Sequence, residues 1–203
     1  LRGGCRIVAA WPGLKKQILG AAIDVGSTTI SAHLCDMNNG QVLTSTGIMN
    51  PQIRFGEDLM SRVSYGLMNH GGAQEMTNAV REGLQQLIAG GAEQAGFSEE
   101  DVLEVVVVGN PVMHHLLLDI DPIELGGAPF ALAVDSALDL KAGELGLSLH
   151  PGSSVYMLPC IAGHVGADAA GVVLAEGPHT RDEIALLIDV GTNAEIVLGN
   201  KQR

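Results

Sequence analysis

Two stretches of the chain share one design: AAIDVGSTTISAHL at residues 21–34 and LLIDVGTNAEIVL at residues 186–198. Each begins as an apolar strand that ends in Ile-Asp-Val-Gly, passes through a short polar turn and returns as a second strand. The distance between the two copies exceeds the period of roughly 20–50 residues that marks solenoid repeats. The repeat therefore predicts two similar subdomains within one larger fold.

The turns of both stretches have the residue types of a phosphate site. Gly26 and Gly191 lack a Cβ, so the backbone there is expected to turn sharply and to approach a ligand closely. Successive N–H groups in such a turn converge on an anion. The turns add polar side chains that complete the candidate cofactor-binding set: Ser27, Thr28 and Thr29 in the first, and Thr192 and Asn193 in the second. A plain hairpin, with glycine for geometry, is the alternative for one copy, and the second copy favours the phosphate site.

Two acids end the leading strands of the repeat. Asp24 and Asp189 are expected to face the same space, where carboxylates hold Mg²⁺ directly or through its waters. Magnesium would also offset the charge of a phosphate chain. Both acids are therefore candidate metal ligands, and Asp24 is also a candidate catalytic residue.

Hydrophobic periodicity and turn residues organise the rest of the chain. The run VLEVVVV at 102–108 is apolar on both faces, which is typical of a strand in the middle of a sheet. The pattern predicts further strands over 41–47 and 155–159, helices over 56–69, 73–95, 111–118 and 162–176, and loops with short elements over 119–154.

Composition bounds the partners of the chain. A net charge of −12 over 203 residues argues against a nucleic-acid or anionic-membrane surface, because both require Lys/Arg patches. No apolar run reaches the roughly 18 residues of a membrane span. The scattered Cys5, Cys35 and Cys160 fit reduced thiols in a cytoplasmic protein. We expect no nucleic-acid partner and no membrane.

Several other side chains have a structural and a functional interpretation. His114 and His115 are more typical of core or interface residues than of groups that contact a partner or cofactor. Glu57 and Asp58 favour a helix start, because acids there interact well with the helix dipole. Cys160 fits a packed thiol, and the methionines at positions 60, 68, 76 and 113 fit flexible core fillers.

With its two loops, the sequence resembles the actin-like ATPase superfamily, whose members bind ATP in a cleft between two ribonuclease-H-like subdomains. The segment Asp24–Thr29 matches the first phosphate loop of that superfamily, and Asp189–Asn193 matches the second. The resemblance implies an α/β fold with three parts: a linker or the end of a preceding domain at 1–20, a first ribonuclease-H-like subdomain at 21–160, and a connecting helix with the start of the second subdomain at 161–203.

The predicted connecting helix at 162–176 contains a further candidate residue. Its small residues would allow close helix crossing at a hinge, with a plain buried helix as the alternative. Asp168 on this helix is a candidate catalytic residue that faces the water at the nucleotide, and a surface or capping role is the alternative.

Further segments are similar to one branch, the reductive activators of corrinoid proteins. They are NPQIRFGEDLMSRV (50–63), VVVVGNPVMHHLLLDIDP (105–122), LGGAPF (125–130) and LPCIAGHVGADAAG (158–171). This resemblance implies the cofactors ATP and Mg²⁺, a corrinoid protein as partner, and reduction of its Co(II) to Co(I). It is also compatible with a homodimer.

The same resemblance implies that this chain is a piece of a longer protein. A [2Fe–2S] cluster is expected only in an N-terminal domain outside this sequence, and the adenosine-binding segment beyond its end. These residues alone are therefore not expected to be active. Two alternatives stay open: a small-molecule kinase or ATP-dependent hydrolase on the same fold, and a non-enzymatic dimerisation module.

Overall fold

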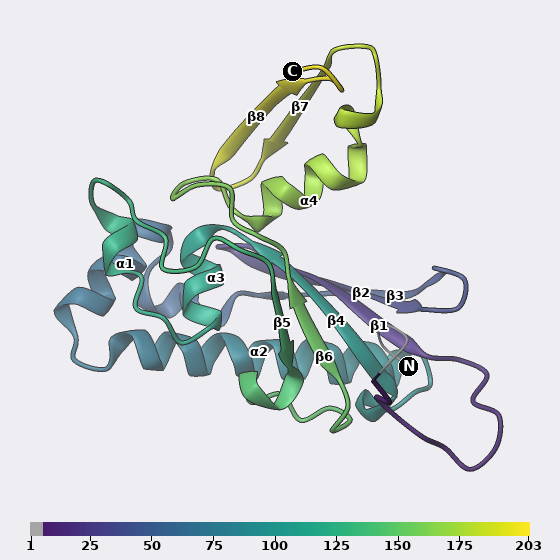
Figure 1. The fold of residues 1–203 in the computed structure, drawn as a ribbon. Coiled ribbons are helices and arrows are strands. Elements are labelled where there is room, and N and C mark those ends of the chain that lie inside the picture. Colours follow the sequence, from purple (N-terminus) through teal and green to yellow (C-terminus); the bar gives the residue numbers. More distant parts are fainter. Residues whose placement is uncertain (1–5) are drawn as a thin grey trace.

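The computed structural model describes residues 6–203, so Cys5 lies outside the described residues. A larger part holds a six-stranded mixed sheet and three α-helices, and a smaller part holds α4 and a two-stranded hairpin (Figure 1). The strands are β1 (Leu19–Val25), β2 (Thr29–Asp36), β3 (Val42–Met49), β4 (Val102–Gly109), β5 (Leu138–Lys141), β6 (Ser154–Met157), β7 (Ala185–Val190) and β8 (Ala194–Gly199). The α-helices are α1 (Leu59–Met68), α2 (Gly72–Gln94), α3 (Pro111–Leu117) and α4 (Ala167–Glu176).

The six-stranded sheet has the order β3-β2-β1-β4-β6-β5. Strands β1, β2 and β3 form an antiparallel meander, whereas β4 runs parallel to both of its neighbours, β1 and β6. Val105 and Val107 of β4 are buried, which confirms that the apolar run at 102–108 is an inner strand. The carboxyl ends of β1 and β4 consequently meet at one edge of the sheet, beside the smaller part.

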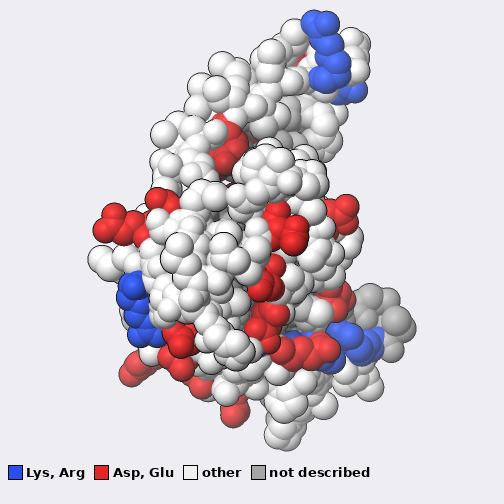
Figure 2. Space-filling model, turned by 90° about the vertical axis from the view of Figure 1, so that its left-hand side faces the viewer, with Lys and Arg blue, Asp and Glu red and all other residues white. Residues whose placement is uncertain are grey.

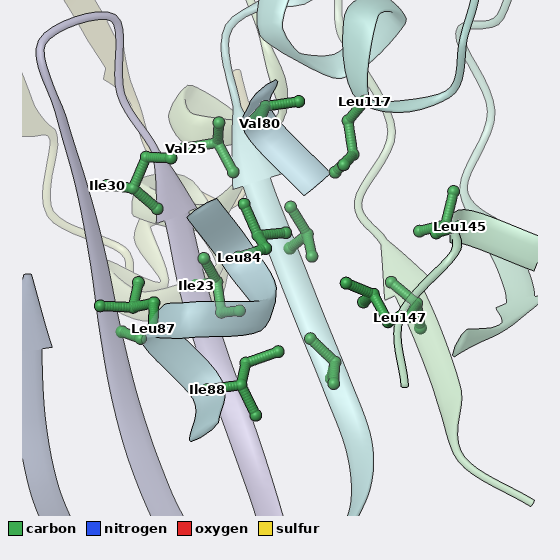
Figure 3. Packing of buried hydrophobic residues seen from close by; sticks show 14 of the residues in the cluster. Ile23, Val25, Ile30, Val80, Leu84, Leu87, Ile88, Leu117, Leu145 and Leu147 are labelled. Atoms are coloured by element: carbon green, nitrogen blue, oxygen red, sulfur yellow. The ribbon is translucent and has the colours of Figure 1, made fainter. Parts of the chain in front are cut away.

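The core of the larger part forms where α2 crosses the sheet. Figure 3 shows Leu84 of α2 beside Ile23 of β1, with Leu87 and Ile88 one turn further along the helix. Leu84 is fully buried, as is Val80 one turn earlier. The helical period predicted over 73–95 is therefore the period of this buried face.

Two helix starts near the sheet edge have side-chain caps. Asp58 precedes α1 and its Oδ1 accepts a hydrogen bond from the Ser61 N–H at 2.7 Å, which confirms that this acid marks a helix start. Asn110 precedes α3 and accepts from the Met113 N–H at 3.0 Å. Each cap fixes where its helix leaves the preceding segment.

The expected helix at 162–176 begins five residues later than predicted, at Ala167. Before it, the chain makes a tight turn in which the Ile161 and Ala162 N–H groups both donate to the Val165 carbonyl. Gly163 packs against the Phe130 backbone so closely that a Cβ would overlap its carbonyl oxygen. This contact holds the segment out of helical geometry, and a run of small residues gives no periodic signal that would reveal it.

The prediction that four methionines fill the core is wrong for two of them. Met76 and Met113 are fully buried, but Met60 is 49% exposed and Met68 is 81% exposed. Helix α1 buries only Val63 and Arg62, Leu59 and Tyr65 pack against the core while partly exposed, and Met60, Leu67 and Met68 face outward. The buried face of this helix is therefore narrower than its content of apolar residues indicates.

The hairpin of β7 and β8 also has one outward apolar face. Its side chains come from alternate positions of the two paired strands, and each is more than half exposed: Leu186, Ile188, Val190, Ile196 and Leu198. We call this set the aliphatic face of the hairpin. The residues between them point to the other side, toward α4 and the rest of the molecule.

Charge is distributed unevenly on the surface. On the face in Figure 2, acidic side chains are widely spread, whereas Lys and Arg lie in small separate groups. Among the described residues there is no helix with both the length and the apolarity that crossing a bilayer requires.

Candidate functional site

A cavity of about 300 Å³ lies where the two repeated turns meet, between the larger and the smaller part. It is lined by Asp24, Gly26, Ser27, Thr28, Thr29, Asn110, Asp168, Asp189, Gly191, Thr192, Asn193 and Glu195. Every site residue expected from the sequence is in this lining. The Thr28 and Thr192 hydroxyl oxygens lie 3.2 Å apart and join the two turns by a hydrogen bond. The structure thus brings together two segments that are far apart in the chain.

Acidic side chains from four elements, β1, α4, β7 and β8, converge on the cavity. Burial, together with the nearby carboxylates of Asp168 and Asp189, raises the pKa of Asp24 from 3.8 to about 6. Burial also raises the pKa of Asp168, against a hydrogen bond from the Ala169 N–H, and Asp189 adds to the rise. Burial and the same two aspartates raise the pKa of Glu195. These carboxylates repel one another.

Among residues 6–203, no Lys or Arg side chain lines this cavity. The charged side chains that a polyphosphate would meet there are therefore all negative, and a cation would have to offset them. Within residues 6–203, no group of three or more His, Cys, Asp or Glu side chains is arranged to hold a metal by itself. Magnesium commonly binds through one or two carboxylates together with waters and the phosphates of its ligand. The acids of this cavity fit that mode of binding.

The two turn glycines serve different purposes. A Cβ on Gly26 would come within 2.6 Å of the Thr29 carbonyl oxygen, so the tight first turn requires glycine. At Gly191 the nearest atom, the Asn193 carbonyl oxygen, would be 3.9 Å away. Glycine at this position leaves the backbone open toward the cavity. Neither glycine has a positive φ, so backbone handedness accounts for neither of them.

Two residues of the lining were missed by sequence reasoning. Asn110 follows β4 and uses both ends of its amide: the oxygen caps α3, and Nδ2 donates to the Ser27 hydroxyl at 3.2 Å. The Gly-Asn-Pro sequence after a buried parallel strand is the signal that could have identified it. Glu195 lies in β8 directly opposite Asp189. Its place two residues after Asn193, the last residue of the second turn, was the only available signal.

The adjacent histidines are buried core residues and do not line the cavity. His115 is held at both ring nitrogens, by the Pro111 carbonyl at 2.8 Å and by the Ala133 N–H at 3.0 Å. This pattern makes His115 neutral, with its proton on Nδ1. Burial lowers the pKa of His114 to about 4, so it is neutral as well. Cys160 is also buried, as expected for a packed thiol.

Comparison with known proteins places this architecture in a family. The family model described as RACo middle region matches residues 19–181. The chain belongs to this family. The match contains the first turn, Asn110 and Asp168, whereas the second turn follows it.

Two longer proteins extend the similarity to the second turn. The corrinoid activation enzyme RamQ of Eubacterium limosum is 34% identical over 199 residues, which cover 97% of this chain and 33% of RamQ. A solved structure of a "Reductive activator for corrinoid,iron-sulfur protein" is similar with a TM-score of 0.90 and 37% identity, over 94% of this chain and 30% of that one. The chain thus spans about a third of the length of both relatives.

Proposed function

We propose that this chain forms much of an Mg-ATP site in a protein that drives the reductive activation of Co(II) corrinoid proteins to Co(I). The single observation that carries the nucleotide assignment is the cavity itself. Two copies of one strand-turn-strand design, from different parts of the fold, meet there and are joined by the Thr28–Thr192 hydrogen bond. A plain hairpin would have no reason to pair with a second copy around a shared space.

The lining residues divide into phosphate-binding and metal-binding groups. The turn residues Ser27 to Thr29 and Gly191 to Asn193 would hold the phosphates through N–H groups and hydroxyls. Asp24 and Asp189 would hold Mg²⁺, which would supply the positive charge that the lining lacks. This arrangement explains how a phosphate chain could enter an acidic cavity.

Asp168 is the residue that we assign to the attacking water. It lies in the first turn of α4 and its carboxylate lines the cavity opposite the first turn. Burial and the Asp189 charge raise the pKa of Asp168, which makes its carboxylate a better proton acceptor. Asp168 would take the proton of the water that attacks the terminal phosphate.

The finer fold assignment is part of the same proposal. We assign the larger part to the first ribonuclease-H-like subdomain of an actin-like ATPase and the smaller part to the start of the second. The three-stranded meander next to two parallel strands supports this assignment. A corrinoid protein as partner is supported by the printed names of RamQ and the solved activator. The homodimer rests on family resemblance alone, and the free thiols Cys35 and Cys160 support a cytoplasmic location.

The test uses the full-length protein. Isothermal titration calorimetry should detect Mg-ATP binding by the wild type and at least tenfold weaker binding by Asp189→Asn, since the lost carboxylate would leave the metal poorly held. Asp182→Asn is the matched control, because Asp182 pairs with Lys201 on the surface of the same part and lies outside the cavity. Wild-type protein that binds no Mg-ATP would refute the nucleotide assignment.

The corrinoid step needs a separate assay. Conversion of Co(II) to Co(I) on a corrinoid protein, followed by absorbance with a chemical reductant present, should require ATP and should be lost in Asp168→Asn. If the wild type binds Mg-ATP but ATP has no effect on the cobalt, the corrinoid role fails. ATP turnover that depends on a small metabolite would then favour the kinase alternative.

A further inference from the structure

The first turn is held by its carbonyl oxygens from the interior of the protein. Asn50 Nδ2 donates to the Gly26 carbonyl at 2.8 Å, and the Asn50 N–H donates to the Thr28 carbonyl at 2.8 Å. Between them, Arg62 Nη2 donates to the Ser27 carbonyl. Three consecutive carbonyls are thus fixed by two side chains and one backbone group of the 50–62 segment.

This anchoring determines the direction of the neighbouring N–H groups. In a trans peptide the N–H points to the side opposite the carbonyl. The N–H groups of Ser27, Thr28 and Thr29 are therefore directed away from Asn50 and Arg62, and all three residues line the cavity. Within residues 6–203, neither the Ser27 nor the Thr28 N–H donates a hydrogen bond. These two N–H groups can therefore donate to a ligand in the cavity.

Arg62 is the unusual member of this arrangement, because it is a completely buried cation. Its other donors also meet uncharged acceptors: Nε reaches the Gly56 carbonyl at 3.0 Å and Nη1 reaches the Gln52 side-chain oxygen at 3.4 Å. No carboxylate of the described residues forms an ion pair with it, although Asp58 is near enough to favour its charge. Burial lowers the pKa of Arg62 to about 10, so the guanidinium is still charged at neutral pH.

A buried charge without a counter-ion is unfavourable unless an opposite charge approaches it. The acids of the cavity do not pair with Arg62, since the backbone of the first turn lies between them. An anion seated on the cavity side of that turn would face Arg62 through the Ser27 peptide. The guanidinium polarises this peptide so that the Thr28 N–H becomes a stronger donor.

We propose that Arg62 is a positioning residue for the phosphates of the bound nucleotide, acting through the Ser27 carbonyl to aim and strengthen the donors of the first turn. This inference rests on the proposed function and adds a residue that does not touch the cavity. It explains why a cation is retained in the interior although no carboxylate of the described residues forms an ion pair with it. It also predicts that Arg62 distinguishes phosphate-bearing ligands from the bare nucleoside.

The test measures by calorimetry the affinity of the full-length protein for Mg-ATP, Mg-ADP and adenosine. Arg62→Met keeps the length of the side chain but removes its charge and donors. We expect Mg-ATP and Mg-ADP to bind about 10- to 100-fold more weakly, the effect of one hydrogen bond to a charged group. Adenosine affinity should change less than about twofold.

Arg62→Lys provides a readout that a merely structural role would not alter. Burial lowers the pKa of lysine far more readily than that of arginine. Phosphate affinity of this variant should be partly restored near neutral pH and should fall as the pH rises toward about 9, relative to the wild type. If Arg62→Met does not fold, the pH response of Arg62→Lys decides alone: a flat response overturns the inference.

Arg81→Met is the matched control. Arg81 is also partly buried and donates through Nε and Nη2 to one backbone carbonyl, that of Leu117, but it lies outside the cavity. This variant should lose thermal stability and keep its nucleotide affinity. Equal loss of ATP and adenosine binding in Arg62→Met, or no loss of either, would overturn the role of Arg62 while leaving the nucleotide site intact. A wild type that binds adenosine but gains nothing from phosphates would overturn both proposals.

Discussion

Replacement of Asp24 by Asn should stabilise the nucleotide-free protein while destroying its Mg-nucleotide site. The pKa of Asp24 is raised in the folded state, so between about pH 4 and about pH 6 the folded protein binds more protons than the unfolded chain. The contribution of Asp24 to the free energy of unfolding is therefore fully present below about pH 4 and is lost as the pH rises through about 6. An asparagine side chain at this position cannot ionise, so the variant avoids that loss.

The expected size of the effect follows from the same pKa. At about 1.36 kcal/mol per unit of pKa, the rise from 3.8 to about 6 sets an upper limit of about 3 kcal/mol. The Asp24 side chain is in contact with solvent, and solvent screening reduces such energies. We therefore expect Asp24→Asn to increase the free energy of unfolding by about 1 kcal/mol near neutral pH and by almost nothing near pH 4.

Urea unfolding of wild type and variant over this pH range measures the difference directly. Asp36→Asn serves as a comparison of opposite sign, because a hydrogen bond from the Asn38 N–H lowers the pKa of Asp36. With Mg-ATP added, the order should reverse, since ligand binding stabilises only the protein that binds it. A variant that is less stable than wild type near neutral pH, or a difference that does not vary with pH, would refute the electrostatic reasoning.

Three further predictions concern packing and the joined turns. Thr28→Val keeps the shape of the side chain but removes its hydroxyl contact with the second turn; calorimetry should show severalfold weaker Mg-ATP binding with unchanged thermal unfolding, and equal affinity would show that the contact is incidental. Leu84→Ala should reduce the free energy of unfolding in urea by about 3 kcal/mol, whereas Met68→Ala, at an exposed position, should change it by less than about 0.5 kcal/mol; similar losses would contradict the assigned core. Gly163→Ala should lower stability by about 1–3 kcal/mol because a Cβ would overlap the Phe130 carbonyl oxygen, and a wild-type melting temperature would show that the turn yields easily.

The sequence allowed the strands and the meeting of the two turns to be predicted, because both depend on local chemistry. The IDVG stretches contain their own turn residues, and the run at 102–108 is apolar on both faces, so each specifies its environment without knowledge of the rest. That Asp24 and Asp189 line one cavity followed from treating the repeat as two matching halves.

Features that depend on contacts between distant segments could not be predicted in this way. The start of α4 depends on Gly163 packing against Phe130, and a sequence of small residues contains no trace of that contact. The anchoring of the first turn depends on side-chain hydrogen bonds from Asn50 and Arg62, which lie 24 and 35 positions along the chain from the residues that accept them. In sequence, Arg62 is indistinguishable from a solvent-exposed arginine on an amphipathic helix.

The aliphatic face of the β7–β8 hairpin has a practical consequence for work with these residues by themselves. Its five branched side chains, between Leu186 and Leu198, form an exposed apolar surface that favours association with other molecules. Hydrophobic dyes should fluoresce on this surface, and concentrated solutions should aggregate and scatter light unless a mild detergent or a solubilising fusion covers it.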